Sequence, residues 1–259
     1  IKNSVEITNG LQLGAKIKYA DRSALSNNTY YSFWGAKRKA RENIISTDYT
    51  DLLQYDIAVQ YTPEQYYRVY KGKKRYLESR YPTFTIKYSE AFSSIKSNNA
   101  QFRKLEGSVR QLIKTDLFSH LDYKLEGGTF IGNKNKMNFA DYNHLNTSDE
   151  LWLTGKSPFS SFMLLDGYKA STNEYWFSTQ VNYYSKYILL KRLPFLQGKL
   201  FNEAVHLKYL YTPTMKNYTE LGYSIDIFKS VSFGVHTSFK KFKYDSFGVR
   251  LSYNLDFIK

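Results

Sequence analysis

Histidine is the residue type in this chain best suited to acid–base chemistry or metal binding, and only four histidines occur among 259 residues. His206 and His236 fall on the polar side of two neighbouring predicted strands, so they could meet, bind a metal or act as a base. The alternative is a pair of hydrogen-bonded side chains inside a folded sheet. No HExxH pattern occurs, and the absence of cysteine excludes a thiolate metal site. We therefore expect no metal and no cofactor.

Nucleophilic catalysis would require a serine, a histidine and an orienting polar group at one place. Serine and asparagine occur throughout the chain, but the GxSxG pattern of a nucleophile elbow does not. Gly127 and Gly128 lack the GK[ST] ending of a phosphate-binding loop. These observations favour a protein that is not an enzyme, with a lipid-acting enzyme as an alternative.

The elements that would position these residues are β-strands, because apolar and polar residues alternate with period two along the whole chain. The clearest segments are residues 11–19, 53–61, 84–88, 121–125, 175–183, 205–211, 221–227, 231–239 and 247–257. Weaker strands are expected at 2–7, closed by the turn pair Asn9-Gly10, and at 29–34. A further strand between the connections 92–101 and 114–118 brings the count to about 12, an even number as in bacterial single-chain barrels.

The length of these segments distinguishes two kinds of all-β protein. The longer of them run over roughly 9–13 residues, longer than the usual soluble strand and close to the ~9–11 residues that cross a bilayer. Apolar runs near the ~20 residues of a membrane helix are absent, whereas tyrosine (25) and phenylalanine (18) are abundant. The sequence predicts one domain, residues 1–259, folded as an antiparallel transmembrane β-barrel that is complete or the C-terminal part of a larger barrel.

The connections predict the orientation of this barrel, because such barrels have short periplasmic turns and long outer loops. Counting back from a periplasmic C-terminus places 240–246, 212–217, 132–173, 92–101 and 37–50 outside. Residues 229–230, 187–198, 114–118, 62–81 and 21–28 then lie inside.

The longest connection, residues 132–173, is expected to be extracellular and contains too many apolar residues for a solvated tail. It is a candidate lid over the barrel mouth, a partner surface, or a small self-packed subdomain. The residues on which this prediction depends are Leu151, Trp152, Leu153, Phe159, Phe162 and Met163.

Charged residues and histidines on the polar sides of the strands are candidates for the lumen. They are Lys16, Lys18, Asp56, Lys87, Asp122, Lys124, Glu126, Lys186, His206, Lys208, Asp226, His236 and Arg250. A lumen lined by both signs can form a cross-linked polar plug or a wet, selective channel. Because about 12 strands enclose a narrow interior, we expect a packed or nearly closed lumen.

The formal charge of +14 and two basic clusters could indicate nucleic acid, anionic lipid or simply solvated loops. The cluster Lys71, Lys73, Lys74 and Arg75 is surrounded by tyrosines, a composition that also binds single-stranded nucleic acid. The strand pattern favours an interfacial belt that contacts lipid phosphates. The expected partners are outer-membrane lipids, including lipopolysaccharide, with other envelope proteins as further candidates and no nucleic acid.

Three stretches carry a family resemblance: residues 61–88, residues 166–198, and the ending ELGYSIDIF…VSFGVHTSF…SFGVRLSYNLDF. Their order resembles the C-terminal barrel of large outer-membrane proteins of the Bacteroidota, in which a carboxypeptidase-regulatory-like domain precedes a barrel of uncharacterised function. The resemblance covers most of the chain and implies a multi-pass protein of the Gram-negative outer membrane. It transfers no catalytic or binding residue. We expect a non-enzymatic barrel with a structural, assembly or transport role, and a porin-like diffusion channel is a further alternative.

Overall fold

The computed structural model describes residues 2–22, 50–92, 100–132, 136–148, 153–194, 201–227 and 231–253. The strands are β1 (Lys2–Thr8), β2 (Leu11–Arg22), β3 (Thr50–Tyr61), β4 (Tyr67–Tyr70), β5 (Lys73–Tyr76), β6 (Thr83–Ala91), β7 (Phe102–Lys114), β8 (His120–Ile131), β9 (Leu153–Thr154), β10 (Tyr175–Ser185), β11 (Phe201–Thr212), β12 (Lys216–Ile227), β13 (Val231–Lys240) and β14 (Lys243–Tyr253). Two 3-10 helices, η1 (Phe139–Asp141) and η2 (Leu190–Arg192), lie in connections. None of the described helices has the length and apolar character needed to cross a membrane.

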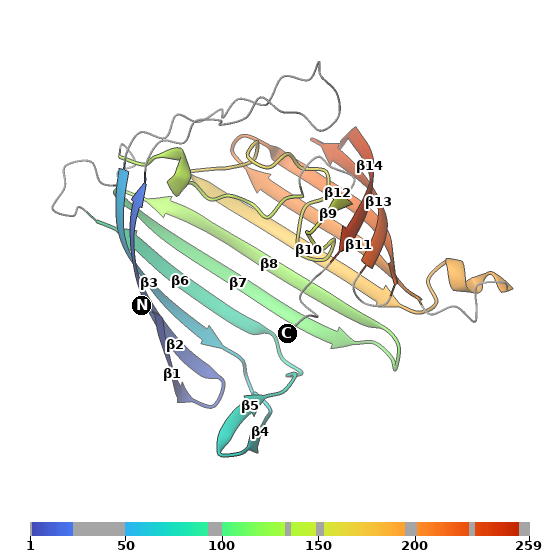
Figure 1. Cartoon of the computed structure of the whole chain (residues 1–259), viewed down its shortest axis with the longest axis horizontal. Coiled ribbons are helices and arrows are strands. Elements are labelled where there is room, and N and C mark those ends of the chain that lie inside the picture. The colour runs from blue at the N-terminus through green and yellow to red at the C-terminus, as the bar shows by residue number, and fades with distance from the viewer. Residues whose placement is uncertain are drawn as a thin grey trace.

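Twelve strands form one sheet in the order β1-β2-β3-β6-β7-β8-β10-β11-β12-β13-β14-β9 (Figure 1). Every pairing is antiparallel except the two-residue contact of β9 with β14. The sheet has the expected number of strands, but it includes β9, which was not predicted, and it does not include a strand between β2 and β3. β2 pairs directly with β3, which leaves no place between them for a further strand, and the strand predicted at 29–34 lies outside the described residues.

The register of β2 and β3 corrects part of the predicted orientation. Arg22 is the register partner of Thr50, so β2 ends and β3 begins at the same end of the sheet. That end also carries the β6–β7 and β8–β10 connections. Placing residues 21–28 at the opposite end was therefore wrong for Asp21 and Arg22, because it depended on the extra strand.

The predicted Asn9-Gly10 turn is confirmed, and it shows why glycine is needed there. Gly10 has a φ of +80°, and a Cβ atom at this position would collide with the carbonyl oxygen of Thr62. The Gly10 carbonyl also accepts a hydrogen bond from Thr62 N at 2.9 Å. This contact joins the β1–β2 turn to the residue that follows β3.

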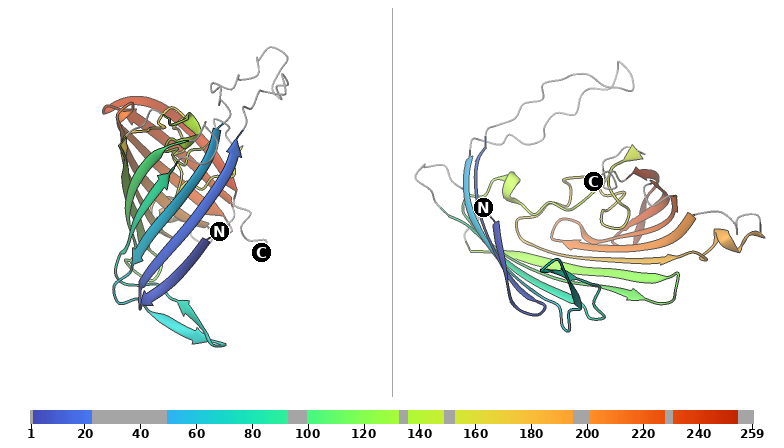
Figure 2. Two further views of the ribbon diagram at one scale, coloured as in Figure 1. Left: turned by 90° about the vertical axis from the view of Figure 1, so that its left-hand side faces the viewer. Right: turned by 60° about the horizontal axis from the view of Figure 1, so that its bottom comes forward.

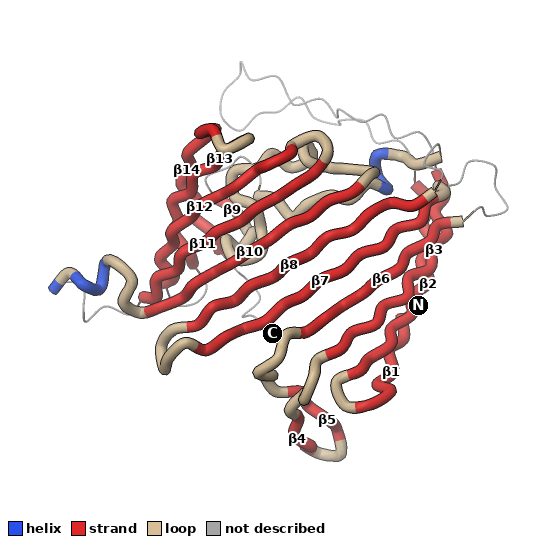
Figure 3. The backbone as a smooth tube through the Cα atoms, turned by 180° about the vertical axis from the view of Figure 1, so that it is seen from behind, coloured by secondary structure: helices blue, strands red, loops and turns tan. Residues whose placement is uncertain are grey.

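The sheet curls into a trough instead of closing on itself (Figure 2). Among the described strands, β1 has a neighbour on one side only, and β14 meets only the short β9 on its far side. The connection between β8 and β10 runs along the concave side, and Figure 3 shows the opposite, convex side. The expected closed barrel is thus seen only as a curved, mostly antiparallel all-β sheet.

The two faces of this sheet have the reverse of the usual polarity. On the convex face, Ile17 is 58 %, Ile86 60 % and Phe247 61 % exposed. On the concave face, His206, Lys208 and Glu220 are each 1 % exposed. A water-soluble sheet normally buries its apolar side chains and solvates its charged ones.

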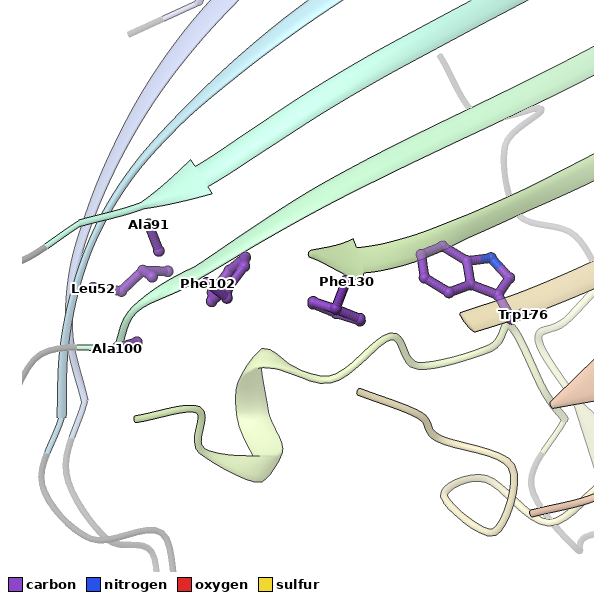
Figure 4. Close-up of a cluster of buried hydrophobic side chains, with 6 residues drawn as sticks. All are labelled: Leu52, Ala91, Ala100, Phe102, Phe130 and Trp176. Atoms are coloured by element: carbon purple, nitrogen blue, oxygen red, sulfur yellow. The ribbon is translucent and has the colours of Figure 1, made fainter. Parts of the chain in front are cut away.

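The concave face is apolar at one end of the trough. Six side chains, five from β3, β6, β7, β8 and β10 and one from the segment that leads into β7, form a buried cluster there, on the same side of the sheet as η1 (Figure 4). They are Leu52, Ala91, Ala100, Phe102, Phe130 and Trp176. Trp176 lies over Gly128, where a Cβ atom would overlap the indole ring. The cluster fixes the end of the trough from which the long connection departs.

Candidate functional site

Strands β10 to β14 bring polar side chains together because their even-numbered residues point to the concave side, except at the start of β14, where a β-bulge shifts the register. Register places Asn182 opposite His206, His206 opposite Gly222, and Gly222 opposite His236. The next row is formed by Gln180, Lys208, Glu220 and Ser238 in the same way. Alternation within each strand and antiparallel pairing between strands therefore build a continuous polar surface.

His206 is held by both ring nitrogens. Its Nδ1 lies 2.8 Å from Asn182 Oδ1, and its Nε2 lies 3.0 Å from Ser224 Oγ. Because an amide oxygen only accepts, we assign the proton to Nδ1, which leaves Nε2 to accept from the serine hydroxyl. Phe159 packs edge-on against the ring at a centroid distance of 4.9 Å. The order of bonds is that of a Ser-His-Asn triad, but Ser224 is fully buried.

His236 lies beside this group, with 6.1 Å between the two imidazole centroids. Its ring covers Gly222 and Gly234, where a Cβ atom would collide with the imidazole nitrogens. His236 is 2 % exposed, and its Nε2 has no hydrogen-bond partner among the described residues. The sequence prediction that His206 and His236 could meet holds to this extent: the rings are neighbours, and each lies on the concave face.

Residues 159–165 of the long connection, here called the plug segment, are bound to this surface by Glu220. The two carboxylate oxygens accept from three consecutive backbone amides, Met163 N at 2.8 Å, Leu164 N at 2.9 Å and Leu165 N at 3.1 Å. Tyr218 donates a further hydrogen bond to the same carboxylate, at 2.6 Å. Consecutive amides that point at one anion form a nest, so the plug segment wraps around the wall residue.

Cationic and amide side chains of the wall bind the carbonyl oxygens of the same segment. Lys208 Nζ donates to Ser161 O, Arg250 Nε donates to Met163 O at 3.0 Å, and Asn182 Nδ2 donates to Phe159 O at 3.0 Å. These bonds all go to main-chain atoms. The arrangement therefore recognises the backbone path of the plug segment more than its side chains, and it satisfies buried charges that would otherwise be costly.

The predicted lumen residues differ in their burial and in their partners. Asp56, His206, Lys208, Asp226 and His236 are buried on the concave face. Several others form ion pairs or register partners in the part of the trough away from the plug segment: Lys16 opposite Asp56, Lys87 with Glu106, Lys124 with Glu126, and Arg110 with Asp122. Lys18 is exposed. Lys186 follows the end of β10 and lies 4.2 Å from the ring centroid of Phe118.

The apolar residues of the long connection that were predicted to need burial differ in how far they are buried. Phe162 and Met163 are buried, and Phe159 is half-buried between Tyr184 and His206. Leu153 belongs to β9 and is 43 % exposed. Leu151 and Trp152 lie outside the described residues.

Sequence reasoning missed the residue that makes most of the contacts, Glu220. The strand was predicted to begin at residue 221, whereas β12 begins at Lys216. The even-numbered residues of this strand form its polar face, and continuing that alternation from Gly222 back to Glu220 would have identified it. Alternation also placed Asn182 and Ser224 on the polar faces of their strands. Nothing in the sequence indicated that they bond to His206.

No group of three or more histidine, aspartate or glutamate side chains that could hold a metal occurs in the described parts of the chain.

Fold and site together define an all-β protein with a curved sheet, a polar concave face and a connecting segment bound against that face. Residues 1–225 match the family described as "Family of unknown function (DUF5686) C-terminal domain", and the chain belongs to this family. A comparison with curated proteins found no match.

Proposed function

We propose that this chain forms part of a transmembrane β-barrel in the outer membrane of a Gram-negative bacterium, with a non-enzymatic structural, assembly or transport role. The observation that carries the proposal is the reversed polarity of the sheet. Apolar side chains cover the convex face, and buried charges line the concave one. Lipid against the convex face explains this distribution, since barrel strands alternate apolar-out and polar-in.

A barrel in lipid must satisfy every backbone polar group, and an open sheet edge in hydrocarbon costs several kcal/mol for each unpaired group. We propose that the edges at β1 and β14 are paired in the membrane, so that the described sheet forms a barrel or the C-terminal part of a larger one. The family resemblance adds the proposal that the protein comes from the Bacteroidota and that a carboxypeptidase-regulatory-like domain precedes the barrel.

The plug segment favours a closed lumen over a diffusion channel, because it fills the concave side of β10–β14 through main-chain hydrogen bonds. Removing residues 148–161 should leave the barrel folded and raise its conductance in a planar bilayer. Unchanged conductance with the loss of a co-purifying protein would assign this segment to a partner surface instead.

Membrane residence is tested by extraction and gel migration. The protein should require detergent to remain monodisperse, and it should migrate differently before and after boiling. A monodisperse species without detergent, with no change on boiling, would refute the proposal.

The Ser224–His206–Asn182 hydrogen bonds favour a second candidate, a hydrolase of lipid acyl esters. Ser224 Oγ would attack the ester carbonyl while His206 Nε2 takes its proton and passes it to the leaving alcohol; water would then release the acid from the serine. Covalent labelling of Ser224 by a fluorophosphonate, lost in His206→Ala, would support this candidate. Absence of labelling in the protein lacking residues 148–161 would refute it.

A further inference from the structure

The β4–β5 hairpin stands apart from the main sheet and projects beyond the end at which β3 stops and β6 begins (Figure 1). Its two-residue loop, Lys71 and Gly72, has positive φ at both positions, the geometry of a tight type I′ turn. Residues 65–77 contain five basic residues and no acidic one. The hairpin is therefore a compact, strongly cationic projection.

Pairing sorts these residues onto two faces. Val69 is opposite Lys74, whereas Arg68 is opposite Arg75 and Tyr70 is opposite Lys73. Since neighbouring pairs alternate between faces, Arg68, Tyr70, Lys73 and Arg75 belong to one face, called here the arginine face. Like charges directly opposite each other destabilise a strand pair. No salt bridge within the described residues joins Arg68, Lys73 or Arg75 to a carboxylate.

The other face fastens the hairpin to the sheet. Lys74 Nζ donates to Glu6 Oε1 at 2.5 Å and to Asn9 Oδ1 at 3.0 Å, and its ammonium lies 4.1 Å from the Tyr67 ring centroid. The hydrogen bond to Glu6 raises the pKa of Lys74. At the root, Gln65 Nε2 donates to Leu77 O at 2.6 Å. Lys74 therefore holds the hairpin in one orientation against β1 and the turn that follows it. The cations of the arginine face make no salt bridge within the described residues.

The same end of the sheet carries a second basic and apolar projection. In the β7–β8 turn, Leu117 is 94 % and Phe118 52 % exposed, and Lys186 lies over the Phe118 ring. Lys114 and Lys186 also line a hollow of ≈ 410 Å³ beside this turn. Cations combined with exposed aromatic and apolar side chains are typical of a membrane–water interface.

We propose that the arginine face of the β4–β5 hairpin binds the phosphate groups of anionic lipid headgroups at this end of the barrel. Arg68 and Arg75 would share a phosphate, which removes the repulsion between them, and guanidinium forks suit phosphate oxygens. Tyr70, whose ring lies 4.8 Å from the Arg75 guanidinium carbon, supplies the amphipathic contact. This inference deepens the proposed function, because it rests on the membrane placement of the sheet.

The test uses the full chain in neutral detergent, with an environment-sensitive dye on Leu77→Cys. The protein contains no other cysteine, and Leu77 is 48 % exposed beside the hairpin. Phosphatidylglycerol or phosphatidylcholine is titrated into the micelles, and the lipid fraction giving half of the dye response is measured. The variant Arg68→Ser, Lys73→Ser, Arg75→Ser is compared with Lys16→Ser, Lys18→Ser, Lys87→Ser, which removes the same charge from the trough.

We expect a response to phosphatidylglycerol that the hairpin variant weakens on the order of 100-fold, at about fivefold for each cation removed, and that the control variant retains. Equal responses to both lipids, or equal behaviour of the two variants, would overturn the proposal. A response to inorganic phosphate alone would indicate a free-anion site, and tighter binding of a single-stranded oligonucleotide a nucleic-acid site. The single variants Arg68→Ser and Arg75→Ser replace the triple variant if it fails to fold, and the boiling shift separately reports failure of membrane residence.

Discussion

Small residues decide how the polar concave face is packed. His236 lies flat over Gly222 and Gly234, and Leu164 of the plug segment occupies the space above Gly248. Each of these glycines leaves room that a Cβ atom would fill. Glycine within a strand usually weakens it, so its presence at three inward positions of β12, β13 and β14 is explained by the close approach of these side chains.

Gly222→Ala should therefore destabilise the protein by about 1–3 kcal/mol, because the new methyl group overlaps the His236 ring in a closely packed interior. The stability is measured as the temperature at which the folded gel band converts to the unfolded one. Gly107→Ala is the matched control, since nothing lies within 4 Å of the added Cβ atom. Equal effects of the two substitutions would show that His236 does not occupy this position.

The plug segment, which is part of the connection between β8 and β10, depends on Glu220. Glu220→Gln keeps one acceptor oxygen but removes another, which leaves part of the nest of amides at Met163, Leu164 and Leu165 unsatisfied. A buried unsatisfied group costs about 1–3 kcal/mol, enough to populate a released plug segment.

Release is measured by the maleimide reaction rate of Ser161→Cys, a fully buried position in the intact protein. The rate should rise in Glu220→Gln and stay low in Glu106→Gln, whose ion pairs with Lys87 and Lys104 are partly solvated. If the rate is the same in both, Glu220 does not hold the plug segment.

The strands and their faces could be predicted from the sequence because period-two alternation is a local signal. Alternation alone places Val205 and Leu207 on one face of β11 and His206 and Lys208 on the other, without any knowledge of which strands pair with β11. The packing of the plug segment could not be predicted, since its bonds join main-chain atoms of residues 159–165 to side chains about 20 to 90 positions away. Because these hydrogen bonds go to main-chain atoms, they impose no pattern on the side chains of residues 159–165 that a sequence could reveal. The placement of a strand between β2 and β3 was wrong for a related reason: pairing of β2 with β3 is a long-range choice that alternation alone does not fix.

The described part of the molecule combines an apolar convex face with a sheet edge, at β1, that no described strand covers. If water surrounds the convex face, replacing an exposed side chain should be almost neutral, within about 0.5 kcal/mol. If lipid surrounds it, an arginine near the bilayer midplane should cost about 2–4 kcal/mol. Ile86→Arg, on the convex face of β6, therefore discriminates between the two environments, and Thr85→Arg, the preceding residue on the concave face, is its control. The boiling-shift temperature of the protein refolded into vesicles measures both.

Lipid contact itself is measured by spin labels placed on Ile86→Cys and Thr85→Cys, which are single thiols in a chain that lacks cysteine. In vesicles, the label at residue 86 should be relaxed by molecular oxygen dissolved in the bilayer and shielded from a water-soluble nickel chelate. The label at residue 85 should show more relaxation by the chelate than by oxygen. A residue-86 label that is relaxed mainly by the chelate would contradict the account, because the apolar convex face would then lie in water.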